Sequence, residues 1–125
     1  LTRIELRWAG EGMPTTGAYL GGWLKALVPG AHLSLACIDR KQPERGMGRI
    51  RELNFSCGAT TLRLHRPEGI GVAIEIDHLE SRMLFPRLDI EALLREELRV
   101  FGRDSRFERA LENAPAIANL PVEMP

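Results

Sequence analysis

A cysteine and a histidine are the two residues whose types come nearest to nucleophilic chemistry. Cys57 ends one alternating segment, in FSCGAT, and His65 lies in the next, so a hairpin could bring the thiol close to the imidazole. Nucleophiles are commonly presented on a sharp turn, and no such turn motif occurs here. The thiol also falls in phase with Phe55, which favours a core cysteine. We therefore expect no catalytic residue, and an enzymatic site centred on Cys57 is the alternative left open.

Metal-ligating side chains are too scattered to predict a site. His32, His65 and His78 lie far apart, as do Cys37 and Cys57, whereas zinc ligands occur in pairs with tight local spacing. The alternative left open is a metal site in which strand pairing brings both cysteines and a histidine together. Two cysteines do not make a disulfide scaffold, and the favoured interpretation is small buried thiols in a reducing cytosol. We expect neither metal nor cofactor.

The segment GEGMPTTG precedes an expected helix and is the best candidate for binding a phosphate. Backbone amides at a helix start favour an anion, and Thr15 and Thr16 lie there. The glycine spacing and the Lys-Ser/Thr pair of a Walker loop are absent, so an ordinary strand-to-helix turn is favoured. A small-ligand or phosphosugar-binding regulatory domain, using Thr15, Thr16 and sheet arginines such as Arg63, remains the alternative function.

Acidic residues occur in two pairs that resemble general acid–base sites only in spacing. Glu96 and Glu97 point to different sides of a helix, and Glu75 and Asp77 lie on a polar strand face where arginines are available to form ion pairs with them.

The seventeen basic and seventeen acidic residues cancel, so the chain has no net charge that would attract nucleic acid or an anionic membrane. The expected location is the cytoplasm, because neither a secretory leader nor a membrane-spanning apolar run occurs.

The elements that must position these residues begin with alternating strands. The segment 1–8 places Ile4, Leu6 and Trp8 on one face. A helix follows over 17–28, started by Thr15 or Thr16 and ended by Pro29-Gly30, and the apolar stripe expected to cover the sheet is Tyr19, Leu20, Trp23, Leu24 and Leu27. Gly21-Gly22 predicts that another element, a strand being the candidate, approaches this helix closely. The further expected strands are 32–39, 49–57, 60–66 and 71–77.

Two short helices are expected near the end of the chain. Asp89 caps the first, whose apolar stripe runs from Ile90 to Phe101, and Gly102 stops it. Asp104 caps the second, which ends at Pro115, and the tail after it is expected to be extended, docked or frayed. Its apolar stripe is Phe107, Ala110, Leu111 and Ala114.

These elements predict a single α+β domain over residues 1–125. The expected order is strand, helix, four strands and two helices. It gives a two-layer sandwich in which three helices cover one face of a five-stranded, mostly antiparallel sheet. Only the link through the first helix is long enough for a parallel crossover. Because the chain starts at Leu1 rather than Met, we expect the C-terminal fragment of a longer protein.

The stretch LREELRVFGRDSRFERAL resembles the C-terminal signature of the OpcA family, the glucose-6-phosphate dehydrogenase assembly proteins. In that family a Leu-x-x-Glu-Leu helix, a short break with Asp and an aromatic-x-x-Ala-Leu helix close the chain. The strand LTRIELRW, the helix YLGGWLKAL and the strand TLRLHRP are also similar to the family's C-terminal domain. The residues at the signature positions are Leu94, Glu97, Leu98, Asp104, Phe107, Ala110 and Leu111.

The resemblance implies a non-catalytic function. A member of this family binds glucose-6-phosphate dehydrogenase and promotes its active oligomer or conformation, at the entry to the oxidative pentose phosphate pathway. Such a protein acts by binding one state of its partner more tightly than the others. The expected contacts are the mixed-charge sheet face and four arginines, Arg63, Arg99, Arg103 and Arg106.

Overall fold

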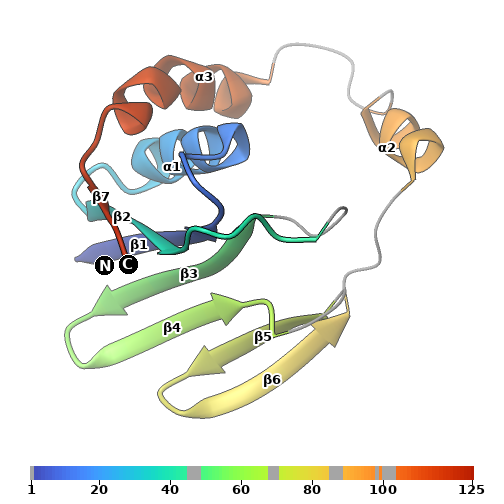
Figure 1. Cartoon of the computed structure of the whole chain (residues 1–125). Helices are drawn as coiled ribbons and strands as arrows, with labels where there is room; N and C mark the ends of the chain where they lie inside the picture. The colour runs from blue at the N-terminus through green and yellow to red at the C-terminus, as the bar shows by residue number, and fades with distance from the viewer. Residues whose placement is uncertain (1, 45–48, 68–70, 85–88, 98, 100–103) are drawn as a thin grey trace.

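The computed structural model of the chain describes residues 2–44, 49–67, 71–84, 89–97, 99 and 104–125. Within them, three helices and a seven-stranded sheet form a mixed α+β fold (Figure 1). The helices are α1 (Thr15–Leu27), α2 (Ile90–Glu97) and α3 (Ser105–Ala118). The strands are β1 (Arg3–Ala9), β2 (His32–Asp39), β3 (Ile50–Cys57), β4 (Thr60–His65), β5 (Gly71–Ile76), β6 (Leu79–Leu84) and β7 (Val122–Glu123).

The strand order is β6-β5-β4-β3-β1-β2-β7. β1 and β2 pair in parallel and are joined by α1, which is the one link that we expected to be long enough for a crossover. From β3 to β6 each strand pairs with its neighbour in antiparallel hairpins, and β3 also pairs antiparallel with β1. Short polar links permit only this arrangement, because a parallel return needs a longer connection.

The prediction of five strands was wrong, because β6 and β7 were not expected. β6 lies between the last strand and the first late helix that we expected, where no strand was predicted, although Leu79, Ser81 and Met83 alternate with Glu80 and Arg82. The β5–β6 hairpin closes through Asp77 and His78, whose φ angles of 44° and 74° are left-handed. A two-residue turn of this kind is usually marked by Asn-Gly or Asp-Gly. The Asp77-His78 pair contains no glycine, so the sequence did not indicate a hairpin turn, and the strand after it was not predicted.

The end of the chain is also more ordered than the sequence predicted. α3 continues through Pro115 to Ala118, and Asn119 Nδ2 donates a hydrogen bond to the Pro115 carbonyl at 3.0 Å. A proline inside a helix costs about 3 kcal/mol or more. Burial of Ile117 in the core offsets part of this cost. β7 then pairs in parallel with β2, so the tail is docked on the sheet.

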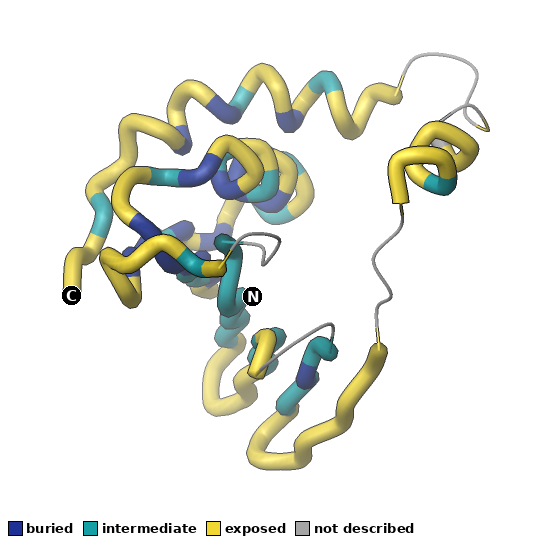
Figure 2. The backbone as a smooth tube through the Cα atoms, turned by 45° about the vertical axis from the view of Figure 1, so that its right-hand side comes forward, coloured by how far each residue is buried: buried dark blue, intermediate teal, exposed yellow. Residues whose placement is uncertain are grey.

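The core lies between α1, α3 and the strands β1 and β2. Ile4, Leu6 and Trp8 of β1 are almost completely buried, as the alternation predicted. Leu35 of β2 lies beside them and Leu24 of α1 belongs to the same cluster. From β3 to β6 Ala73 is the one described strand residue that is buried, so the far half of the sheet in Figure 2 is mostly intermediate or exposed.

α2 does not cover the sheet as the sequence predicted. It stands apart from α1 and α3 in both views, and its apolar residues Ile90, Leu93 and Leu94 are exposed (Figures 1 and 2). Leu98 and Phe101, the rest of the expected stripe, lie outside the described residues. Asp89 caps the helix as predicted, because its Oδ1 accepts from the Ala92 N–H at 2.7 Å. In the part of the chain that is described, no helix has the length and apolarity to cross a bilayer.

Candidate partner-binding surface

Close contact between α1 and α3 organises the surface that we identify as the best candidate for binding. A Cβ added at Gly22 would lie 2.5 Å from the Ala110 carbonyl oxygen, and one at Gly21 would lie 2.7 Å from Ile117 Cγ2. Asn113 Nδ2 also donates to the Gly22 carbonyl at 3.3 Å. The predicted close approach at these glycines is confirmed, but the approaching element is a helix and not a strand.

Three aromatic side chains lie along the rim of this helix pair. Tyr19 and Trp23 of α1 are 40% and 37% exposed, and Phe107 of α3 is 55% exposed. All three border one hollow of about 320 Å³ between the two helices, together with Leu20, Asp104, Arg106 and Ala110. We call Tyr19, Trp23 and Phe107 the aromatic surface.

A second hollow of about 370 Å³ continues from the aromatic surface toward the start of α1. Tyr19 borders both hollows, and Leu111 of α3 lines the second one. The remaining residues around it are mainly apolar: Met13, Pro14, Thr15, Ala18, Ala114, Pro115 and Ala118. The two hollows form a mostly apolar strip along the α1–α3 seam, which is suited to apolar side chains of a protein partner.

The apolar stripes predicted as core are therefore divided between core and surface. Leu24, Ala110 and Ala114 are buried as expected, whereas Trp23, Phe107 and Leu111 are partly exposed. Small residues let α3 pack closely on α1, and only the side of each helix that faces the seam or the sheet is then covered. Larger apolar residues beside the seam stay at the rim. The prediction that Phe107 and Leu111 cover the sheet was wrong.

Among the predicted partner-binding arginines that the structure describes, Arg106 is the one that borders the aromatic surface. It is exposed at the start of α3 and lines the same hollow as Phe107. The local fold is set by Asp104, whose Oδ1 accepts from the backbone N–H groups of Arg106 at 3.0 Å and Phe107 at 3.2 Å. This confirms the predicted cap. The cap holds a cationic and an aromatic side chain next to each other at a helix start.

Two of the other predicted arginines, Arg63 and Arg99, do not border the aromatic surface. Arg99 pairs with Glu96 at 3.2 Å beyond α2, and Arg103 lies outside the described residues. Arg63 lies on the opposite, polar face of the sheet, in β4. The three described arginines, Arg63, Arg99 and Arg106, therefore lie on different parts of the molecule.

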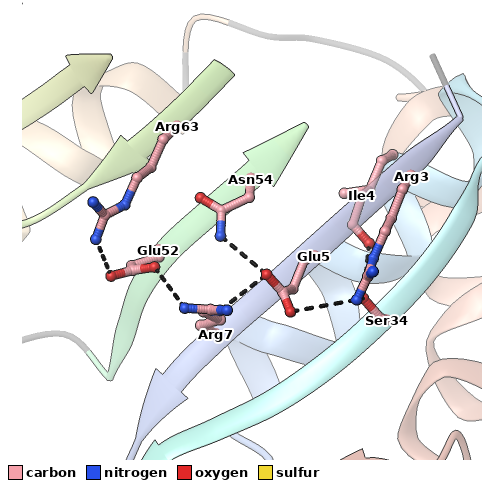
Figure 3. A network of polar contacts seen from close by, with 8 residues as sticks. All are labelled: Arg3, Ile4, Glu5, Arg7, Ser34, Glu52, Asn54 and Arg63. Carbon is pink, nitrogen blue, oxygen red and sulfur yellow. Dashed lines mark hydrogen bonds and ion pairs between the residues drawn. The ribbon is translucent and has the colours of Figure 1, made fainter. Parts of the chain in front are cut away.

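Arg63 is held in a network of ion pairs that crosses three strands (Figure 3). Its Nη2 lies 2.6 Å from Glu52 Oε1, and Arg7 Nη1 lies 3.3 Å from the other oxygen of the same carboxylate. Glu5 in turn accepts hydrogen bonds from Arg7 at 3.0 Å and from Asn54 at 3.1 Å. The guanidinium of Arg63 is thus already neutralised by the protein itself.

The same network shifts the ionisation of its two glutamates. Burial by itself would raise the pKa of Glu52, but the hydrogen bond and charge of Arg63, with the charge of Arg7, hold that pKa below its ordinary value. Burial likewise acts to raise the pKa of Glu5, and Asn54, Arg7 and Arg3 together lower it. Both side chains therefore carry full negative charge at neutral pH and balance the surrounding arginines.

The loop before α1 has the wrong polarity for a phosphate site. The Arg49 guanidinium donates to the carbonyls of Ala9 at 2.9 Å, Gly10 at 2.8 Å and Glu11 at 3.0 Å, and it also bonds the Gly12 carbonyl. The loop thus directs acceptors at a cation that the chain itself supplies. A phosphate cradle instead directs N–H groups at its ligand.

The start of α1 also differs from the prediction. Its cap position is Pro14, without a side-chain hydrogen bond, so neither Thr15 nor Thr16 is the cap. Thr15 faces the mostly apolar second hollow. Because α1 covers the face of Ile4 and Leu6 while Arg63 lies on the other face, the threonines and Arg63 do not form one ligand site.

The approach of the Cys57 thiol to the His65 imidazole is not observed either. Cys37 is buried as expected, with its Sγ 3.6 Å from the Gly10 carbonyl oxygen, but Cys57 is exposed at the end of β3. Cys57 pairs with Thr60 and His65 pairs with Glu52, at opposite ends of the β3–β4 hairpin. Among the residues that the structure describes, no three His, Cys, Asp or Glu side chains are grouped to hold a metal ion.

Sequence reasoning missed Tyr19 and Trp23 as surface residues. The glycines of α1 could have indicated this. Gly17, Gly21 and Gly22 lie on the side of α1 that packs against other elements, and Trp23 lies at the border of that side. No protein-family model, curated protein or solved structure matches the chain, so the surface is interpreted from its own chemistry.

Proposed function

We propose that this chain is a non-catalytic interaction module that binds glucose-6-phosphate dehydrogenase and promotes its active oligomer or conformation. The proposal takes the partner from the OpcA resemblance and the contact surface from the geometry. The observation that carries it is the exposure of Phe107 and Leu111. These are signature residues, and they line the hollows of the α1–α3 seam instead of the core.

The composition of the surface favours a protein partner. Aromatic residues and arginine are enriched at interface centres, where truncating one of them costs 2 kcal/mol or more in hot spots. Tyr19, Trp23, Phe107 and Arg106 supply that combination around one hollow. A partner that inserts apolar side chains into the strip would remove the exposed aromatic area from water.

Binding changes the partner's assembly only through differential affinity. If the aromatic surface binds one oligomeric or conformational state of the dehydrogenase more tightly, that state gains population in proportion to the affinity ratio. No covalent chemistry is needed, and the chain would act at stoichiometric rather than catalytic amounts. Arg106 would direct the contact toward acidic groups on the partner.

The test is binding and light scattering with the dehydrogenase of the same organism. We expect the chain to bind, to shift the enzyme's oligomer distribution and to raise its activity. Trp23→Ala and Phe107→Ala should each weaken binding about 30-fold, corresponding to about 2 kcal/mol. Circular dichroism of each variant checks that the fold is kept.

Ile90→Ala is the matched control, because Ile90 is an exposed apolar residue on a different helix and lies outside the signature stretch. It should bind like the unmodified chain. No binding of the dehydrogenase by the unmodified chain would refute the proposed partner. Loss of binding in Ile90→Ala but not in Trp23→Ala would refute the aromatic surface and move the contact to α2.

A further inference from the structure

The two edges of the sheet differ in how they are protected from pairing with another strand. β7 is two residues long and lies between Pro121 and Pro125, which cannot donate to a neighbouring strand. β6 is six residues long, contains neither proline nor lysine, and pairs with β5 without a register shift. Natural proteins usually block an exposed edge with such devices. Among the described residues no strand pairs with the outer side of β6, so this edge is open, as its outer position in Figure 1 shows.

The register of the β5–β6 hairpin decides which backbone groups face that open edge. The two-residue turn at Asp77 and His78 leaves Ile76 and Leu79 as the flanking pair. In hairpins of this type the flanking pair is hydrogen-bonded, and bonded and non-bonded pairs then alternate. The backbone groups of Leu79, Ser81 and Met83 consequently point toward β5. Those of Glu80, Arg82 and Leu84 point away from the sheet.

The sequence of β6 is complementary to itself in antiparallel orientation. With a two-fold axis through Ser81, Glu80 of one copy lies opposite Arg82 of the other, and the reverse pair forms on the other side of the axis. Both are residues whose backbone groups face outward, so the same register also matches donors with acceptors. On the apolar face, Leu79 lies opposite Met83 of the other copy. These two side chains are 79% and 47% exposed in the single chain.

We propose that β6 pairs with β6 of a second copy, joining two sheets into one through a two-fold axis at Ser81. Opposite charges directly across an antiparallel pair stabilise it, and like charges destabilise it. The interface is isologous, so it closes at a dimer and does not propagate. It lies at the opposite end of the sheet from β7 and away from α1 and α3, so it is independent of the proposed function.

The charge pattern is what selects a second copy over another occupant of this edge. Glu80 and Arg82 already contact each other within one strand, with Arg82 Nε 2.8 Å from Glu80 Oε1. Both remain largely exposed there, so they can exchange same-strand for cross-strand pairing without losing an ion pair. An unrelated strand would need the reverse charge order to match them, whereas a second β6 supplies it by symmetry.

The test is sedimentation equilibrium of the chain from about 10 µM to about 1 mM, the range expected for a contact of this size. We expect a monomer–dimer equilibrium. Glu80→Arg and Arg82→Glu should each weaken dimerisation about tenfold or more, because each places like charges opposite each other twice. The double variant Glu80→Arg with Arg82→Glu restores opposite charges across the axis and should recover the dimer.

Arg82→Pro tests the backbone contact separately from charge. The N–H removed faces the open edge, so the β5–β6 pairing survives while the dimer is lost. Glu123→Arg, a charge reversal on the β7 edge, is the matched control and should leave the dimer unchanged. A chain that stays monomeric at the highest concentration would overturn the proposal. So would growth beyond dimers, or a double variant as weak as the single ones.

Discussion

The two halves of the sheet carry similar apolar alternation, but only one half is covered. β1 and β2 lie beneath α1 and α3, and their inward residues Leu6 and Leu35 are almost completely buried. β5 and β6 extend beyond the helices, and their Ile76 and Leu79 are exposed on the same kind of alternating strand (Figure 2). The difference teaches that alternation specifies an apolar face, whereas burial depends on where the covering helices are placed.

A network of charges on the opposite face connects the two halves. Glu52 of β3 contacts Arg7 of β1 on one side and Arg63 of β4 on the other. The uncovered half is thus attached to the core by β-ladder hydrogen bonds and by ion pairs (Figure 3). The following substitutions measure how unequally the two halves contribute to stability.

The largest expected difference is between two leucines of the sheet. Leu6→Ala should lower the free energy of unfolding by about 2–5 kcal/mol, because it leaves a cavity in the buried core. Leu79→Ala should change it by about 0.5 kcal/mol or less, because the side chain is already in water. Urea unfolding at low protein concentration measures both values. Equal losses would show that the β6 face is covered in solution and would contradict the comparison.

A smaller loss is expected where the helices of the covered half meet. Gly22→Ala should destabilise by about 1–3 kcal/mol, because the new methyl group must displace the Ala110 backbone of α3. The gain in helix propensity, up to about 1 kcal/mol, only partly offsets this. Thermal unfolding compares it with Gly30→Ala, where an added Cβ meets no atom within 4 Å. A stabilised Gly22→Ala variant would contradict the close helix contact.

The smallest effect is expected at the charge network that joins the halves. The pKa of Glu52 is lowered in the folded state, so its stabilisation is present above the ordinary glutamate pKa of about 4.3 and is lost as the pH falls through the folded pKa. Glu52→Gln should therefore lower stability at pH 7 and make the decline below about pH 4.3 shallower.

Unfolding free energies measured from pH 7 to pH 3 test this directly. Glu52→Asp, which keeps the charge, should retain more of the acid-dependent decline than Glu52→Gln. Curves for the unmodified chain and Glu52→Gln that run parallel over the whole range would show that this carboxylate does not couple folding to pH.

The local elements of the covered half could be predicted from sequence to a large extent. Ile4, Leu6 and Trp8 alternate strictly, and Asp104 caps α3 as expected. The failures share one cause, which is that tertiary contact overrode a local signal. Pro115 did not end α3 because Ile117 beyond it is buried, and the Asp77-His78 turn formed without its usual glycine.

The candidate site was predictable in part. Arg106 was named from the sequence and lies at the aromatic surface, whereas Arg63 was named and lies on the other face of the sheet. Tyr19 and Trp23 were assigned to the core because helical spacing alone cannot tell which side of an apolar helix faces the protein. α3 packs against Gly21 and Gly22, and this contact determines which side of α1 is buried.

By itself, the sequence determined the class of fold, the parallel crossover through α1, the polar and apolar strand faces and the two aspartate caps. These features depend on the period of side chains and on hydrogen bonds between near neighbours, which a short segment specifies alone. Only the tertiary structure decided which apolar residues are core and which are surface. Burial depends on the distance to elements far along the chain, and α1 and α3 together reach only part of the sheet that the strands build.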